Sequence, residues 1–109
     1  MKILVVCGAG ASSTFVAQRL RQAAQREGTE LLVRAGVPGM VAMEADAGDV
    51  VLVGPHLASA LSEIERDAVT RQAHAVLLPE DVFGDRDGTR TFALVKAATA
   101  ADRIERTPR

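Results

Sequence analysis

The stretch Ile3–Thr14 reads ILVVCGAGASST, and its two halves differ in chemical character. The first four residues are aliphatic, which is typical of a short strand buried on both faces of a sheet. Glycines and alanines follow, and then three hydroxyl residues of the kind that cap helix N-termini. The stretch therefore predicts a central strand, a tight turn and the start of a helix.

The same alternation continues through the rest of the chain. Further short apolar runs predict strands, and helical spacing of apolar residues between them predicts helices, the first of which Gly28 closes. Because apolar strands that alternate with helices form parallel sheets covered on both faces, we predict a single α/β domain. The expected strands are 3–6, 31–33, 50–53 and 75–78; the expected helices precede Gly28, lie weakly at 40–45, and pass through Leu57–Ala68 and Phe92–Ala98.

Cys7 stands at the carboxyl end of the first predicted strand, where open parallel sheets bind ligands. Small residues let main-chain N–H groups approach an anion closely, and the helix dipole adds positive potential at the same place. We therefore predict a phosphate-binding loop formed by Gly8, Ala9, Gly10, Ala11, Ser12, Ser13 and Thr14.

The position of Cys7 suggests a nucleophile. A free thiol has a pKa near 8.5, and a helix N-terminus can lower it, which raises the fraction of reactive thiolate. The donors that stabilise the thiolate would also bind a phosphoryl group during its transfer. The alternative interpretation is that Cys7 is a small buried hydrophobic residue, the usual role of a lone cysteine.

Composition excludes several other classes of protein. The 109 residues carry a net charge of −1 and only 3% aromatic side chains, which disfavours nucleic-acid binding. One cysteine and two histidines predict neither a disulfide nor a metal site, and we expect no cofactor. Apolar runs are too short for a signal peptide or membrane insertion, so we expect a cytoplasmic protein, as a monomer.

Three motifs in order resemble the IIB component of the lactose/cellobiose (chitobiose) branch of the bacterial sugar phosphotransferase system. The resemblance covers almost the whole chain, and we assign residues 1–106 to this domain and 107–109 to a C-terminal tail. The motifs are Cys7-x-x-Gly10-x-Ser12-Ser13-Thr14, then Asp49-Val50-Val51-Leu52-Val53-Gly54-Pro55 leading into Ile64-Glu65, and Phe83-Gly84-x-x-Asp87-Gly88.

The resemblance implies a four-stranded parallel sheet with flanking helices, for which we predict a flavodoxin- or Rossmann-like order 2-1-3-4. It implies a phosphocysteine on the residue that matches Cys7. Phosphate would arrive from a phosphohistidine on a IIA protein and leave for a cellobiose-, chitobiose- or lactose-like sugar held by the membrane transporter IIC. Through IIC the protein would associate peripherally with the inner face of the membrane.

This chain departs from the family pattern at several positions that bear on sugar class and partner docking. The departures are Ala11 where a larger apolar residue, commonly Met, is usual, Thr14 for Ser, Phe83 for Tyr, Pro79 for Asp and His56 for Gln. His56 follows the third strand, on the rim expected to hold Cys7, and could contact phosphate or a partner or could be a solvated residue at a helix start. His74 is expected at the opposite rim in a structural role.

Three rival functions stay open. A low-molecular-weight tyrosine phosphatase or arsenate reductase would need Arg as the sixth residue after the cysteine, where this chain has Ser13. A nucleotide-binding module would need a third glycine and an acidic residue after the second strand, which instead runs into Arg34 and Ala35. A regulatory relative that keeps the phosphorylatable cysteine but does not serve transport is also consistent with the sequence.

Overall fold

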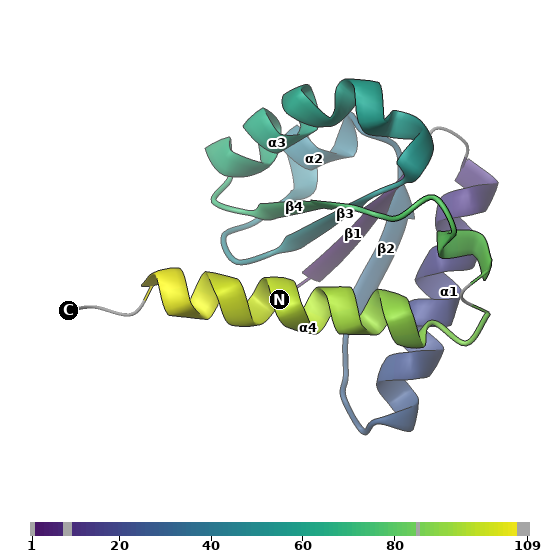
Figure 1. Ribbon diagram of the computed structural model, residues 1–109. Helices are drawn as coiled ribbons and strands as arrows, with labels where there is room; N and C mark the ends of the chain where they lie inside the picture. The colour runs from purple at the N-terminus through teal and green to yellow at the C-terminus, as the bar shows by residue number, and fades with distance from the viewer. Residues whose placement is uncertain (1, 8–9, 85, 107–109) are drawn as a thin grey trace.

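A computed structural model describes residues 2–7, 10–84 and 86–106 of the chain. Its strands are β1 (Lys2–Val6), β2 (Leu32–Gly36), β3 (Val50–Val53) and β4 (His74–Leu77), and its α-helices are α1 (Gly10–Arg26), α2 (Met40–Glu44), α3 (Leu61–Thr70) and α4 (Thr89–Arg106). Short 3₁₀ segments, η1 (Pro55–Ala60) and η2 (Val82–Gly84), precede α3 and α4. Figure 1 shows the sheet between its helices.

The four strands form one parallel sheet in the order β2-β1-β3-β4, which confirms the predicted fold class and strand order. Each strand leads through a helical segment to the next parallel strand, as the alternating sequence pattern predicts. Gly28 has a φ of +71° just after α1, the left-handed conformation in which glycine commonly ends a helix.

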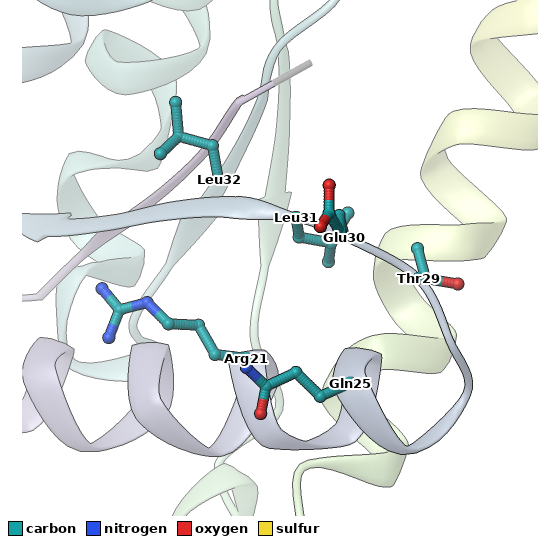
Figure 2. A pocket seen from close by; sticks show the side chains of 6 residues that line it. All are labelled: Arg21, Gln25, Thr29, Glu30, Leu31 and Leu32. Carbon is teal, nitrogen blue, oxygen red and sulfur yellow. The ribbon is translucent and has the colours of Figure 1, made fainter.

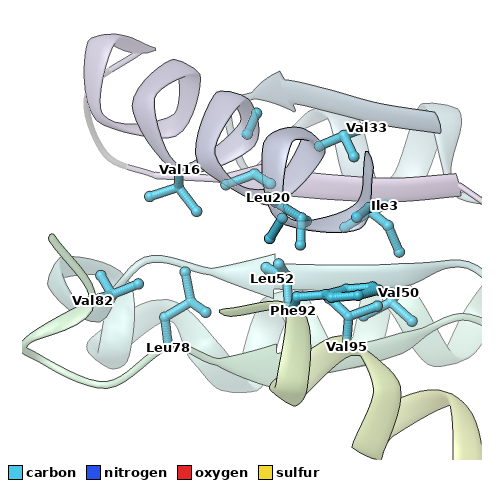
Figure 3. Packing of buried hydrophobic residues seen from close by; sticks show 14 of the residues in the cluster. Ile3, Val16, Leu20, Val33, Val50, Leu52, Leu78, Val82, Phe92 and Val95 are labelled. Carbon is cyan, nitrogen blue, oxygen red and sulfur yellow. The ribbon is translucent and has the colours of Figure 1, made fainter. Parts of the chain in front are cut away.

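Two apolar layers enclose the sheet. On one face, α1 and α4 contribute Val16, Leu20, Phe92 and Val95, which pack on Leu52 of the sheet (Figure 3). On the other face, α2 and α3 place Val41, Ile64 and Ala68 on the alternate side chains of β1 and β3. The core thus lies on both sides of β1 and β3, and these two strands are buried throughout apart from Lys2.

The edges of the sheet differ from the sequence prediction. We expected every strand to be buried, but in β2 and β4 most residues are partly or fully exposed, because each has a neighbour on one side only. The boundaries also move: β2 continues to Gly36, and His74 begins β4 instead of preceding it. Helical structure after β3 begins as the 3₁₀ segment η1, where Leu57 interrupts the helical dihedral angles.

Candidate functional site

Cys7 lies directly after β1, between the turns that follow β2 and β3. Its main-chain N–H donates to the carbonyl of Gly36 with an N···O distance of 3.4 Å. On the other side, Val6 pairs with Val53, and the Gly54 N–H donates to the Val6 carbonyl at 2.8 Å. The ends of three neighbouring strands therefore hold the main chain of Cys7 in place at the carboxyl rim of the sheet.

Gly54 makes room for the sulfur of Cys7. A Cβ atom at position 54 would lie 2.8 Å from Cys7 Sγ and 3.3 Å from its Cβ, closer than side chains normally approach. The φ of Gly54 is −60°, so glycine is needed here for space rather than for an unusual backbone conformation. Sequence analysis did not identify this contact. A signal for it was present in the sequence, because the residues that directly follow the two central strands, Cys7 and Gly54, are both small and lie at the same register.

Burial controls the acid–base chemistry of Cys7. Only 4% of the residue is exposed, and it belongs to the cluster of apolar residues beneath α1 and α4. This burial raises the pKa of the thiol, while a main-chain hydrogen bond from Gly54 lowers it to a smaller extent. Our expectation of a lowered pKa is wrong for the resting protein, because the cost of an ionised sulfur in an apolar environment is the larger effect.

The predicted phosphate-binding loop is described in part. Gly8 and Ala9 lie outside the described residues, as do the side chains of Ala11 and Ser12, whereas the backbone of α1 begins at Gly10. Ser13 is completely buried and Thr14 is exposed. The helix N-terminus therefore lies three residues after Cys7, earlier than the capping residues Ser12, Ser13 and Thr14 predicted, and phosphate binding by Gly8–Thr14 stays a prediction.

A groove lies at the carboxyl end of the sheet, next to the turn after β3. Pro55, His56 and Glu80 line its volume of about 290 Å³. His56 lies in the first turn of η1 and is exposed, and Glu80 follows β4. The prediction that His56 lies on the rim of Cys7 is thus confirmed, whereas the approach of Glu80 depends on the pairing of β3 with β4 and was not foreseen.

The acidic loop that follows β4 is organised by hydrogen bonds within the protein. Arg90 donates to both carboxylate oxygens of Asp81, at 2.9 and 3.2 Å, and this hydrogen bonding lowers the pKa of Asp81. The main-chain N–H of Thr89 donates to Asp87 at 3.0 Å and lowers the pKa of that carboxyl group. Asp81 and Asp87 thus organise the start of α4.

A different set of charged groups occupies the amino end of the sheet. The carboxylate of Asp49, a residue only 3% exposed, accepts hydrogen bonds from the main-chain N–H groups of Lys2 and Asp46 at 2.9 and 2.8 Å. Lys2 Nζ lies 3.1 Å from Asp46 and donates to the Glu44 carbonyl at 2.6 Å. His74 also lies at this end, as expected.

A wider groove of about 590 Å³ lies between α1 and the segment that enters β2 (Figure 2). Figure 2 shows Arg21 and Gln25 on α1 below this segment, where Thr29 and Glu30 lie. The Arg21 guanidinium donates to the Val33 carbonyl at 2.7 Å. Because this groove adjoins the start of β2, it lies at the opposite end of the sheet from Cys7.

Two other kinds of feature are absent from the described residues. No described helix combines the length and the apolar character needed to cross a membrane. Within the same described parts of the chain, His, Cys, Asp and Glu side chains do not gather in groups of three that could hold a metal ion.

Comparisons with known proteins agree on one family. The family model "PTS system, Lactose/Cellobiose specific IIB subunit" matches residues 2–93. The oligo-beta-mannoside-specific EIIB component of the PTS of Bacillus subtilis (strain 168) is 24% identical over 91 residues, which cover 84% of this chain and 88% of that protein. The lactose-specific IIB component domain of the phosphoenolpyruvate:carbohydrate phosphotransferase system from Streptococcus pneumoniae has a similar fold, with a TM-score of 0.73, 19% identity, and coverage of 90% of this chain and 96% of that one.

Proposed function

This chain belongs to the lactose/cellobiose-specific IIB subunit family of the sugar phosphotransferase system, and from that premise we propose that it is a phosphocarrier that works through Cys7. As a component of this system it has a transferase role. The proposed reaction has two steps, in which the sulfur first accepts a phosphoryl group and then passes it to a sugar. The placement of Cys7 at the carboxyl end of β1, shortly before the N-terminus of α1, is the observation that supports this most strongly.

In the first step, the donor is a phosphohistidine on a IIA protein. The N–P bond of the donor breaks as a bond forms between phosphorus and Cys7 Sγ. Because burial raises the pKa of Cys7, the resting sulfur carries its proton, which must leave as the S–P bond forms. The donor imidazole gains a free nitrogen lone pair when phosphorus departs, and it is the natural acceptor of that proton.

The surroundings of Cys7 suit reversible transfer better than hydrolysis. Main-chain N–H groups at the start of α1 can stabilise the phosphoryl oxygens, and Ser13 stands where a phosphatase of this architecture would need Arg. The buried position of the sulfur also limits the approach of water to the phosphocysteine. A phosphorylated Cys7 would therefore persist long enough to meet a second partner.

In the second step, the acceptor is a sugar held by a IIC membrane protein. The relatives are named for oligo-β-mannoside and lactose, so we propose a β-linked oligosaccharide of the cellobiose, chitobiose or lactose type. The S–P bond breaks as a sugar hydroxyl oxygen bonds to phosphorus, and the hydroxyl proton replaces the one that Cys7 lost in the first step, because the raised pKa of the sulfur favours its return to the thiol. We accordingly place the protein in the cytoplasm, at the inner face of the membrane through its contact with IIC.

Intact-mass analysis tests the first step directly. The protein is incubated with a IIA protein that has been phosphorylated beforehand, and wild type is compared with Cys7→Ser and with His74→Asn, a control at the opposite end of the sheet. We expect one added phosphoryl group on wild type and on His74→Asn, and none on Cys7→Ser. Equal labelling of Cys7→Ser, or an unlabelled wild type with several competent donors, would contradict the proposal.

A further inference from the structure

We propose that Asp87 and Gly88 are positioning residues that hold α1 where its N-terminus can receive a phosphoryl group on Cys7. This inference rests on the proposed function, because it concerns the phosphorylated form of Cys7. It gives a role to the last two residues of the third sequence motif, Phe83-Gly84-x-x-Asp87-Gly88. The two proposed transfer steps do not involve this motif.

Gly88 brings the main chain of the loop before α4 directly against the main chain of α1 (Figure 1). A Cβ atom at position 88 would overlap the carbonyl group of Arg19 and lie 3.1 Å from the main-chain nitrogen of Leu20. The φ of Gly88 is +75°, a left-handed conformation that glycine adopts without strain. Both the space and the conformation therefore require glycine, and only glycine lets the loop lie this close to α1.

Hydrogen bonds fix the same loop on both sides. The Arg26 guanidinium, on α1, donates to the main-chain carbonyl of Asp87. The Asp87 carboxylate accepts from the Thr89 N–H at 3.0 Å. The Gly88 carbonyl accepts from the Phe92 N–H at 2.9 Å in the first turn of α4. Asp87 and Gly88 are thus bound both to the start of α4 and to the side of α1.

These contacts hold α1 in a way that its apolar face does not. Leu20 and Ala24 are buried against the sheet, and apolar packing of this kind is non-directional. A hydrogen bond depends on direction, so it opposes a shift of α1 along its axis or a rotation about it. Arg21, about 200° around the helix from Arg19, donates to the Val33 carbonyl of β2 at 2.7 Å. The loop and β2 therefore hold α1 from two sides.

The position of α1 decides where its N-terminal N–H groups lie relative to Cys7. The helix begins at Gly10, three residues after Cys7, and its first N–H groups are the donors proposed for the phosphoryl oxygens. Arg19 lies about 14 Å along the helix from Gly10, a length over which a helix moves as one body. A displacement of α1 at the loop would therefore reach these donors, and their hydrogen bonds would weaken as the geometry changes.

A pair of glycine substitutions separates this contact from a simple loss of stability. Gly88→Ala adds a methyl group that overlaps α1, whereas Gly28→Ala adds one that meets no atom within 4 Å. The two glycines have similar φ values, +75° and +71°, so both variants carry a similar conformational cost. Each variant is labelled by phosphorylated IIA and titrated between about pH 5 and pH 8, where the phosphoryl dianion takes up a proton. ³¹P NMR follows this titration.

We expect Gly88→Ala to move the midpoint of the phosphorus titration to higher pH, because displaced N–H groups stabilise the dianion less. Phosphoryl transfer from IIA should slow about tenfold, the factor that corresponds to the loss of one hydrogen bond. Gly28→Ala should keep the wild-type midpoint and rate, although its melting temperature also falls. A merely structural role of Gly88 would not move the midpoint.

A second pair of variants covers the case in which Gly88→Ala does not fold. Arg26→Met removes the donor to Asp87, and Lys96→Met removes the 3.3 Å ion pair between α4 and Glu27. Both side chains are exposed and each variant loses one positive charge, so the two are matched. Arg26→Met should move the midpoint in the same direction as Gly88→Ala by a smaller amount, Arg26→Lys should restore most of it, and Lys96→Met should match wild type.

Failure of this inference is distinguishable from failure of the proposed function. If wild type accepts no phosphoryl group, the phosphocarrier function is wrong and this inference falls with it. If wild type is labelled on Cys7 but Gly88→Ala and Arg26→Met keep its midpoint, Asp87 does not help to position α1 and the phosphocarrier function stands. A rise in the KM for IIA alone would lead to the same conclusion, because the loop would then contact the partner. Equal shifts in the two control variants would also overturn the inference, since general stability would be the cause.

Discussion

At the amino end of the sheet, Lys2 has a raised pKa because its charged form is favoured, whereas at the carboxyl end Cys7 has a raised pKa because its charged form is disfavoured. Hydrogen bonding to Asp46 is the largest influence on Lys2, with the charges of Asp49 and Asp46 acting in the same direction and desolvation opposing them. Burial is the largest influence on Cys7. The same direction of shift thus has opposite physical causes at the two ends.

The difference distinguishes a stabilising end of the sheet from a reactive end. At the amino end, the buried Asp49 carboxylate accepts main-chain N–H groups from two separate segments, so it ties β1 to the loop before β3. At the carboxyl end, a glycine leaves space for the sulfur, and the neighbouring groove exposes a histidine and a carboxylate. Substitutions should therefore reduce mainly stability at the first end and mainly chemistry at the second.

Asp49→Ala should have the largest effect and tests the stabilising end. Loss of the carboxylate leaves the N–H groups of Lys2 and Asp46 without their acceptor and removes the negative partner of Lys2 Nζ, 3.4 Å away. We expect the free energy of unfolding to fall by about 3 kcal/mol. Urea unfolding followed by circular dichroism measures this change.

The matched control for this prediction is Asp46→Ala. The Asp46 side chain is 72% exposed, so its removal should cost no more than about 0.5 kcal/mol. Equal losses for the two variants would show that the buried position of Asp49 has no special importance, and the distinction between the two ends would weaken.

Gly54→Ala comes next and perturbs the reactive end. The added methyl group would meet Cys7 Sγ, so either the sulfur or the turn after β3 must shift. We expect a loss of about 1–3 kcal/mol in stability, as for other overpacked sites. Because the displaced atom is the proposed phosphoryl acceptor, we also expect phosphorylation by IIA to slow more than the loss of stability alone explains.

Gly39→Ala is the control for Gly54→Ala. Gly39 has ordinary helical dihedral angles, and a Cβ there would meet no atom within 4 Å. Its stability should stay within about 1 kcal/mol of wild type, with any change more favourable than unfavourable. If Gly39→Ala slowed phosphorylation as strongly as Gly54→Ala, contact with the sulfur would not be the cause.

How far the sequence predicts this site depends on which residues one considers. The apolar run before Cys7 and the small residues after it were sufficient to place that cysteine at a strand-to-helix turn. Its burial was less apparent, although Ile3, Val5 and Cys7 alternate and therefore face the same apolar layer. A helix N-terminus was expected to dominate the pKa, and the density of apolar packing around the sulfur proved more important.

Other features could not be predicted because they depend on pairing between distant strands. The close approach of Gly54 to Cys7 follows from the register of β1 with β3, and the approach of Glu80 to His56 requires β4 to lie beside β3. The strand order was predicted through a family resemblance, whereas individual contacts across the rim need the register as well. The exposed edges of β2 and β4 likewise depend on strand order and not on local sequence.

The smallest expected effect concerns the ionisation of the Cys7 thiol and its contribution to stability at high pH. Because its thiol has a raised pKa in the folded protein, the folded state holds the thiol proton more tightly than the unfolded chain does. This contribution to stability is fully present below the pKa of the unfolded thiol, near 8.5, and is lost as the pH rises through the folded value. Wild type should therefore lose stability above about pH 8.5 more steeply than Cys7→Ala, which has no thiol to ionise.

Alkylation by iodoacetamide measures the same property directly. The folded protein should react several-fold more slowly at pH 7.5 than the urea-unfolded protein, and its rate should rise with pH to a midpoint above that of the unfolded thiol. Faster alkylation of the folded form would mean that amides at the start of α1 outweigh burial, and Cys7 would then be an ionised nucleophile at rest. In that case the proton would already have left before IIA arrives, and burial would no longer be the cause that sets the ionisation of Cys7 apart from that of Lys2.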